Sequence, residues 1–181
     1  ALLASRPTVD VDEKFEEIRK KLDSFEGISE APEPTDFEGS LRTYQREGLG
    51  WLHFLEEFQF GGCLADDMGL GKTVQALAHL QLLKAEGRKG TTLVVTPKSL
   101  VFNWARETAR FTPDLRCGSY IGPKRSRLLE NLDDYDILFS TYGTVRRDVD
   151  VLSKHQFLYI ILDEAQAIKN VESQNAKAAR I

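Results

Sequence analysis

The spacing of apolar residues predicts a helix near the start of the chain. Apolar side chains recur every three or four residues from Val11 to Phe25, which indicates one apolar stripe on a helix of roughly four turns ending near Gly27. Ala31-Pro32-Glu33-Pro34-Thr35 follows as a linker, because proline fixes φ and lacks an N–H donor. We therefore divide the chain into residues 1–38, an acidic helix with its linker, and residues 39–181. We expect the helix to pack on its own protein, with a regulatory or inter-domain role as the alternative.

From residue 41 onward, helical patterns alternate with short apolar or β-branched runs. The runs predict strands at Gly62–Ala65, Thr91–Thr96, Leu115–Tyr120, Ile137–Ser140 and Phe157–Leu162. The helical patterns lie at Leu41–Phe58, Val74–Ala85, Pro97–Arg110, Lys124–Asn131, Val145–Leu152 and Ser173–Ile181. Such alternation predicts an α/β fold, in which a parallel sheet has helices on both faces. We expect Phe157–Leu162 to be its most buried strand.

Composition adds limits to this picture. Hydrophobic residues make up 41% and charged residues 29% of 181 positions, as in an ordinary soluble domain. No apolar run approaches the length of a membrane span, no secretion signal precedes the domain, and the first residue is not Met, which suggests a segment of a longer chain. Residues 1–40 contain 11 acidic and five basic residues, whereas the remainder has a net charge of +2. The slightly basic remainder is compatible with nucleic acid on one face.

A glycine-rich loop, Asp66-Asp67-Met68-Gly69-Leu70-Gly71-Lys72-Thr73, lies between a predicted strand and a predicted helix. In this arrangement, backbone N–H groups and the helix N-terminus surround phosphate oxygens, and glycine lets the backbone come close. Lys72 would reach the β- and γ-phosphates, and the Thr73 hydroxyl would bind Mg²⁺. The strict phosphate-loop pattern has glycine where this chain has Asp66. The alternative is a Gly-rich turn before a helix whose lysine is merely exposed.

Two acidic residues, Asp163 and Glu164, end the apolar run at 157–162. A buried strand would present both carboxylates at its carboxyl end, beside the phosphate loop. Asp163 would hold Mg²⁺, which prefers oxygen ligands and keeps several waters, and Glu164 would accept a proton from the attacking water or orient it. The alternative is an acidic pair that caps the next helix.

Gln45 lies about 20 residues before the phosphate loop, near the start of a predicted helix. A glutamine amide can both donate to and accept from an adenine edge, so Gln45 is a candidate reader of the base. A surface glutamine is the alternative.

Six stretches together resemble the first RecA-like lobe of superfamily-two helicase ATPases, and most closely the Swi/Snf family of double-stranded DNA translocases. They are Leu41–Gln45, Asp66–Thr73, Val94–Leu100, Asn103-Trp104, Ser140–Tyr142 and Asp163–Asn170. They occur in the family's order. Aspartate at position 66 is normal in this family, which removes the objection to the phosphate loop. The residues at 63–73 and 163–170 look most like those of prokaryotic members of the family.

The resemblance implies a role for each matching residue. ATP would be bound by Gln45, Asp67, Met68, Gly69, Leu70, Gly71, Lys72, Thr73 and Val74. Mg²⁺ would be held by Thr73 and Asp163, with Lys72, Asp163 and Glu164 as the catalytic residues. DNA backbone would be contacted by Thr96, Pro97, Lys98, Thr141 and Tyr142. Gln166 occupies a position where many relatives have histidine and would couple the ATP site to the DNA.

The resemblance also implies partners. The family's first lobe continues to a further strand and is followed by a second lobe, whose arginines contact the γ-phosphate. We expect the isolated chain to bind nucleotide weakly and not to turn over ATP at a useful rate. The partners would be double-stranded DNA, the second lobe and a DNA-bound protein target, in the cytoplasm near the nucleoid of a prokaryote or in a eukaryotic nucleus. An RNA or DNA helicase of the same superfamily and a non-catalytic nucleotide-binding or protein-docking module are the alternatives.

Overall fold

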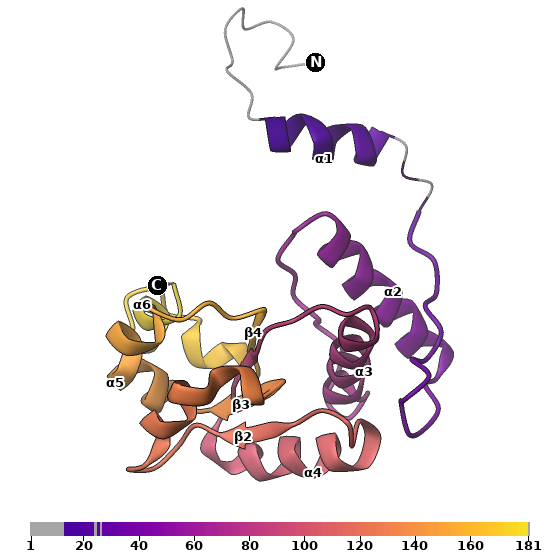
Figure 1. The fold of residues 1–181 in the computed structure, drawn as a ribbon. Coiled ribbons are helices and arrows are strands. Elements are labelled where there is room, and N and C mark those ends of the chain that lie inside the picture. Colours follow the sequence, from indigo (N-terminus) through magenta and orange to yellow (C-terminus); the bar gives the residue numbers. More distant parts are fainter. Residues whose placement is uncertain (1–12, 24, 26, 181) are drawn as a thin grey trace, which may run out of the picture.

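Four parallel strands form the centre of the computed structural model, which describes residues 13–23, 25 and 27–180 (Figure 1). The strands are β1 (Thr92–Val95), β2 (Cys117–Ser119), β3 (Ile137–Ser140) and β4 (Tyr159–Leu162). Their order across the sheet is β2-β3-β1-β4, and every neighbouring pair is parallel. The α-helices are α1 (Glu13–Asp23), α2 (Thr43–Glu57), α3 (Lys72–Ala85), α4 (Val101–Phe111), α5 (Tyr142–Leu152) and α6 (Gln174–Ala178). Short 3₁₀ helices are η1 (Lys98–Leu100), η2 (Arg125–Asp134) and η3 (Ala165–Ile168).

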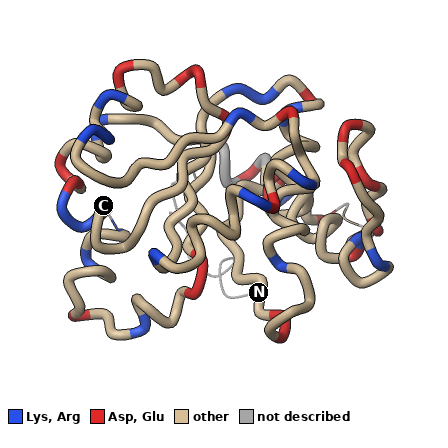
Figure 2. The backbone as a smooth tube through the Cα atoms, turned by 90° about the horizontal axis from the view of Figure 1, so that it is seen from below, with Lys and Arg blue, Asp and Glu red and all other residues tan. Residues whose placement is uncertain are grey.

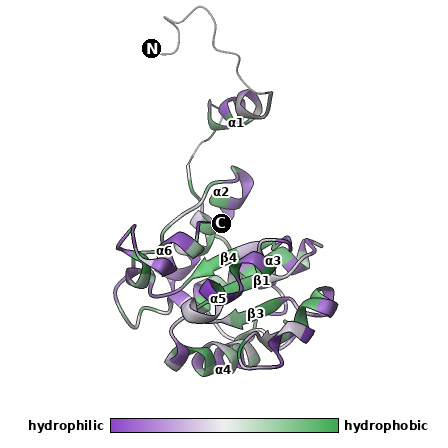
Figure 3. Cartoon of the chain, turned by 90° about the vertical axis from the view of Figure 1, so that its left-hand side faces the viewer, coloured by the Kyte–Doolittle hydropathy of each residue, from purple (hydrophilic) through white to green (hydrophobic). Residues whose placement is uncertain are grey.

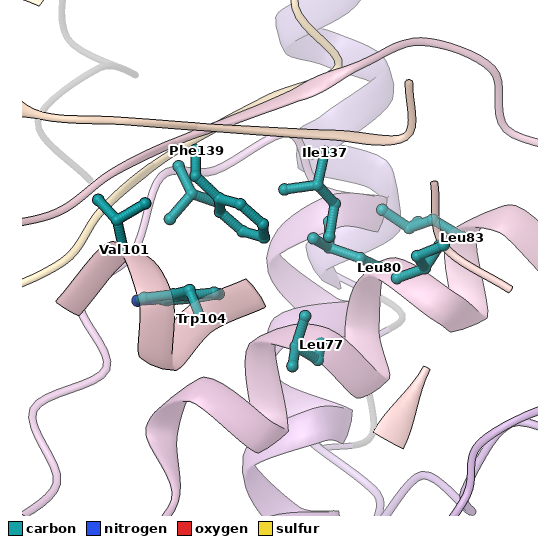
Figure 4. Packing of buried hydrophobic residues seen from close by; sticks show 9 residues of the cluster. Leu77, Leu80, Leu83, Val101, Trp104, Ile137 and Phe139 are labelled. Atoms are coloured by element: carbon teal, nitrogen blue, oxygen red, sulfur yellow. The ribbon is translucent and has the colours of Figure 1, made fainter. Parts of the chain in front are cut away.

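Helices cover both faces of the sheet, as the alternating pattern predicts. Because successive side chains of a strand point to opposite faces, each face has its own core. One core joins the sheet to α3 and α4 through Leu77, Leu80, Leu83, Val94, Val101, Trp104, Leu115, Ile137 and Phe139 (Figure 4). The other joins it to η2 and α5 through Leu93, Val95, Tyr120, Leu129, Leu138, Tyr142 and Leu152. Figure 3 shows the apolar strands enclosed between helices with polar outer surfaces.

The linker lacks regular structure, as predicted, but it packs on the domain. The Ala31 N–H donates to the Arg46 carbonyl of α2 at 3.1 Å. Phe37 is buried and stacks on Phe111 of α4, with ring centroids 5.9 Å apart. The domain boundary between residues 38 and 39 therefore stays a prediction, and no gap in packing marks it.

Helix α1 forms close to its predicted position, and its packing on its own protein stays a prediction. Figures 1 and 3 show α1 standing away from the α/β body, and Leu22 on its predicted apolar stripe is exposed. Phe25, just beyond α1, contacts the rings of Phe54 and Phe58 in α2. The extended chain that follows is held along α2 by the hydrogen bond from the Ala31 N–H to the Arg46 carbonyl. Val11 and the other residues before 13 lie outside the described residues.

Two strand predictions differ from the structure. Gly62–Ala65 is not a strand, because it pairs with none of the four strands and leaves Cys63 and Ala65 exposed. The run at 157–162 does form β4, but β4 lies at the edge of the sheet and Ile160 is 57% exposed. The most buried strands are β1 and β3, in which every residue is buried. Hydrophobicity alone identified a strand at 157–162 but not its place in the sheet.

The segment predicted as a helix at 124–131 is instead the 3₁₀ helix η2, interrupted at Asn131. Arg125 holds the start of this segment against α5 by donating through Nη2 to Asp148 Oδ1 at 2.7 Å. Tyr120 also donates to Asp148, at 3.0 Å from Oδ2. These hydrogen bonds depress the pKa of Asp148, with the Arg125 bond as the main cause. The contacts give Arg125 a structural role.

The burial of His79 predicts that the stability of the folded chain depends on pH. Its imidazole is buried between α3 and β4, edge-on to the Tyr159 ring at 5.5 Å, and neither ring nitrogen has a hydrogen-bond partner. Burial lowers the pKa of His79 to about 4, from 6.5 in an exposed site, despite the nearby Glu56 carboxylate. The unfolded chain therefore binds the proton more readily than the folded chain. Stability should fall as pH drops from 6.5 to about 4, by up to about 3 kcal/mol.

Urea unfolding of the purified chain at pH 7.5, 6 and 5 measures this effect. His79→Phe keeps a ring against Tyr159 but cannot be protonated, so its loss of stability between pH 7.5 and 5 should be smaller than that of the unchanged chain. An equal loss in both proteins would show that other groups cause the acid sensitivity.

No helix among the described residues combines the length and the apolar character needed to cross a membrane.

Candidate ATP site and DNA-facing loops

The glycine-rich loop meets the N-terminus of α3, as predicted, although no strand leads into it. Gly69 and Gly71 have φ values of +85° and +79°, a region that residues with a Cβ rarely adopt. The Lys72 ammonium lies beneath the loop, where Nζ donates to the carbonyls of Asp66 at 2.6 Å and Asp67 at 3.1 Å. A phosphate could replace these carbonyls as the acceptor. The loop thus has the backbone and the cation that phosphate binding requires.

Gln45 lies against the glycine-rich loop. Its Nε2 donates to the Leu70 carbonyl at 3.0 Å, and its Oε1 accepts from the Arg42 N–H at 2.9 Å. Tyr44 donates its hydroxyl to the same Leu70 carbonyl at 3.0 Å. A Cβ added to Gly71 would lie 2.5 Å from Gln45 Nε2. Helix α2 and the loop are therefore closely packed on each other.

Asp66 and Gln75 form a contact that the sequence did not reveal. Gln75, completely buried in the second turn of α3, donates through Nε2 to Asp66 Oδ2 at 3.0 Å. A Cβ on Gly48 of α2 would lie 1.9 Å from Gln75 Oε1, so glycine is needed there. Asp66 and Gln75 line a pocket of about 710 Å³ between α2 and the loop. Asp66 is the first residue of the loop and departs from the strict phosphate-loop pattern. Its hydrogen bond with Gln75 anchors the loop to α3.

The remaining predicted nucleotide contacts differ in exposure. Met68 is 90% exposed at the tip of the loop, and Asp67 is also exposed. Thr73 is half-buried in the first turn of α3, and Val74 packs against the core between α2 and α3.

The register of the sheet brings the predicted acids and the DNA-motif residues to one edge. Val95 pairs with both Ser140 and Leu162, so the next residue of each strand, namely Thr96, Thr141 and Asp163, follows at the same carboxyl end. Ligands of open α/β sheets bind at this edge. The Asp163 N–H donates to the Val95 carbonyl at 2.9 Å, which continues the β1–β4 pairing by one residue.

The Asp163 carboxylate is held by three donors. Its Oδ2 accepts from Thr96 Oγ1 at 2.9 Å and from Trp104 Nε1 at 2.8 Å. Its Oδ1 accepts from the Glu164 N–H at 2.9 Å. Sequence reasoning used Trp104 as a family mark but missed its contact with Asp163, because the two residues are 59 positions apart.

Glu164 has a left-handed backbone, with φ +50°, which is strained for a residue with a side chain. Such strain recurs at functional sites. Gln166 donates to Glu164 Oε2, so the predicted coupling residue touches the predicted catalytic acid. The turn after β4 therefore holds Glu164 away from regular helix geometry.

The five residues predicted to face DNA are not equally exposed. Thr96 is fully buried and Tyr142 is 7% exposed, so their side chains face inward. The Tyr142 hydroxyl donates to the Asp163 carbonyl at 2.6 Å. Burial, followed by the carboxylates of Asp163 and Glu164, raises the pKa of Tyr142 to about 12.

The other three members lie nearer the surface. Lys98 is exposed in η1, just after Pro97, and is free to reach a phosphate. Thr141 caps α5 by accepting from the Thr144 N–H at 3.2 Å. Figure 2 shows Lys and Arg spread among acidic residues around the body and not gathered in one stripe. DNA contact at this edge would therefore depend on local groups such as Lys98 and on backbone N–H groups.

The phosphate-loop residues and the strand-end acids form two separate hydrogen-bonded groups in the part of the chain that the structure describes. His79 of α3 contacts Tyr159 of β4, and this contact links the helix after the phosphate loop to the strand before the acids. No group of three or more His, Cys, Asp or Glu residues within residues 13–23, 25 and 27–180 could hold a metal by itself. Thr73 and Asp163 each offer oxygen atoms of the kind that Mg²⁺ takes together with phosphate and water, and their joint binding of Mg²⁺ stays a prediction.

Comparison with known proteins identifies the same segment. Residues 44–181 match the family model of the SNF2-related domain. YwqA of Bacillus subtilis is 38% identical over 175 residues, and the TATA-binding protein-associated factor mot1 of Aspergillus fumigatus is 36% identical over 167 residues. These matches cover 94% and 84% of this chain, but the chain spans only 19% and 9% of those two proteins.

A solved structure agrees with the observed fold. The Sulfolobus solfataricus SWI2/SNF2 ATPase core in complex with dsDNA matches with a TM-score of 0.76 and 38% identity, over 85% of this chain and 31% of that chain. The family match includes the glycine-rich loop and the strand-end acids. The chain therefore belongs to the SNF2-related family and forms the first RecA-like lobe of a SWI2/SNF2-type ATPase core.

Proposed function

We propose that the chain is the ATP-binding first lobe of a motor that hydrolyses ATP and moves along double-stranded DNA. The observation that supports this most is the position of Asp163, which ends β4 at the carboxyl edge of the sheet with its carboxylate fixed by Thr96 and Trp104. The Sulfolobus relative in complex with dsDNA makes duplex DNA the expected track.

In the proposed site, Lys72 contacts the β- and γ-phosphates and the loop from Asp67 to Val74 surrounds them. Gln45 reads adenine, for which its amide must exchange the Leu70 or the Arg42 contact. Thr73 and Asp163 hold Mg²⁺, which would neutralise charge on the phosphate oxygens when bound. Glu164 orients the attacking water or accepts its proton.

Hydrolysis at a useful rate requires a second RecA-like lobe that supplies arginines to the γ-phosphate. Arginines of this kind are worth roughly 10³- to 10⁵-fold in rate in P-loop enzymes. The track-facing groups are Pro97 and Lys98 of η1, the backbone at Thr96, and the Thr141–Tyr142 segment. A DNA-bound protein is the proposed target, in the nucleoid or in a nucleus according to the organism.

Phosphate release by the full-length protein tests the proposal. The rate is measured without nucleic acid, with duplex DNA and with single-stranded RNA. Duplex DNA should stimulate hydrolysis most. Stronger stimulation by RNA would assign the protein to RNA helicases, and no hydrolysis under any condition would favour a non-catalytic module.

The 181-residue chain should be inactive in the same assay, since it would lack the proposed arginines. Hydrolysis by this chain at the full-length rate would show that the second lobe is not required.

A further inference from the structure

The Asp163 carboxylate of the proposed ATP site is bonded to the interior of the lobe. The Trp104 indole, which is 3% exposed, reaches its carboxylate through the only polar group that tryptophan has. The ring otherwise packs in the core beside Phe139, with centroids 6.2 Å apart (Figure 4). A phenylalanine would keep an aromatic ring beside Phe139 but would be smaller and would lack the N–H. The indole N–H is the feature of tryptophan that reaches Asp163.

Trp104 and Thr96 bracket the segment proposed to touch DNA. Thr96 directly follows β1 and Trp104 lies in the first turn of α4, and both donate to the same oxygen, Asp163 Oδ2. Pro97 and the exposed Lys98 lie between these two donors. A displacement of η1 that shifts either donor would weaken its hydrogen bond to Asp163, because hydrogen-bond strength falls steeply with distance and angle.

The second proposed DNA segment reaches the same residue from another side. Tyr142, the first residue of α5, donates to the main-chain carbonyl of Asp163 at 2.6 Å. The hydroxyl is buried, and its neighbour Thr141 lies at the carboxyl edge of the sheet. Both segments that face the proposed track are thus joined to Asp163 by direct hydrogen bonds.

We propose that Trp104 is a positioning residue that orients Asp163 for Mg²⁺ and, together with Thr96, transmits DNA contact at Lys98 to the metal end of the ATP site. This inference rests on the proposed function. Trp104 itself touches neither nucleotide nor DNA. Groups that orient a metal ligand in this way are typically worth 10- to 100-fold in metal affinity or activity.

Trp104→Phe in the full-length protein tests the proposal, because it keeps an aromatic ring in the core and removes the N–H. Binding of a fluorescent ATP analogue is measured in Mg²⁺ and in EDTA, and hydrolysis is measured with and without duplex DNA. Affinity in EDTA should be unchanged, whereas the gain in affinity on adding Mg²⁺ and the stimulation by DNA should each fall by roughly tenfold. DNA affinity should be unchanged.

Phe139→Leu is the matched control, because it disturbs the same core without touching Asp163. It should lower the midpoint of thermal unfolding while the Mg²⁺ gain and the DNA stimulation stay intact. The same pattern in Trp104→Phe would overturn the proposal and leave Trp104 a packing residue only.

The Thr96→Val and Thr96→Ser pair keeps the test decisive if Trp104→Phe does not fold. Serine retains the hydroxyl donor and should keep the Mg²⁺ gain, whereas valine should lose it. Equal behaviour of the two variants would contradict the proposal. If the unchanged protein shows neither an Mg²⁺ gain nor DNA stimulation, the proposed function itself fails, which is a separate result from any difference among variants.

Discussion

Glu164→Gln in the full-length protein is expected to reduce ATP hydrolysis by roughly 10²- to 10⁴-fold, the usual contribution of a general base. Glutamine has nearly the same shape as glutamate but cannot accept a proton at neutral pH. The left-handed backbone of Glu164 and the contact from Gln166 depend little on the charge, so the turn after β4 should be kept. Affinity for ATP should therefore change little, and phosphate release measured beside nucleotide binding separates the two effects.

Glu172→Gln supplies the matched control for the loss of one negative charge. Glu172 lies on the surface, where it pairs with Lys177 at 3.0 Å, and its side chain is 80% exposed. Its replacement should leave hydrolysis unchanged. Full hydrolysis by Glu164→Gln would remove Glu164 from the proposed catalytic residues, whereas loss of ATP binding would point to a structural role.

Gly71→Ala is expected to destabilise the chain by about 2–3 kcal/mol and to weaken ATP binding. A side chain at φ +79° costs about 1–2 kcal/mol. The new Cβ would also lie 2.5 Å from Gln45 Nε2 and would displace that group. The hydrogen bond from Gln45 to the Leu70 carbonyl, worth about 1 kcal/mol, would then be lost. Urea unfolding measures the first effect, and titration with a fluorescent ATP analogue measures the second.

The variant Gly69→Ala separates the cost of backbone strain from the cost of the collision with Gln45. Gly69 has a similar φ of +85°, but a Cβ there would meet no atom within 4 Å. Gly69→Ala should therefore show the strain alone and a smaller loss of stability than Gly71→Ala. Measured against Gln45→Ala alone, Gly71→Ala and Gly69→Ala should cost the same, because the side chain that the Cβ at position 71 would meet is gone. Equal losses in both single variants would show that the contact between Gln45 and the loop contributes nothing.

The sequence predicted most elements because their signals are local. Helix α3 and strand β3 lie where a run without Gly or Pro and a short apolar run predicted them, since both signals are carried by neighbouring residues. The run at 62–65 failed as a strand because a strand forms only with a partner. The exposure of β4 was missed for the same reason, since strand order depends on contacts between distant parts of the chain.

The candidate site divides in the same way. The chemistry of Lys72 and Glu164 follows from residue types within short motifs, and those motifs also identify the family. The partners of Asp163 do not, because Trp104 and Tyr142 are 59 and 21 positions away from it and only the parallel register of the sheet brings them together. Nor could the sequence show that Thr96 faces inward or that Gln75 anchors Asp66.

By itself, then, the sequence determined the family and predicted which residues bind phosphate and hold a metal, since these signals lie in short segments. Only the tertiary structure decided how those residues are held. Hydrogen bonds and burial depend on distances between segments that the order of residues does not encode locally. The indole bond to Asp163, which joins the proposed metal end to the proposed DNA-facing loop, belongs to this second class.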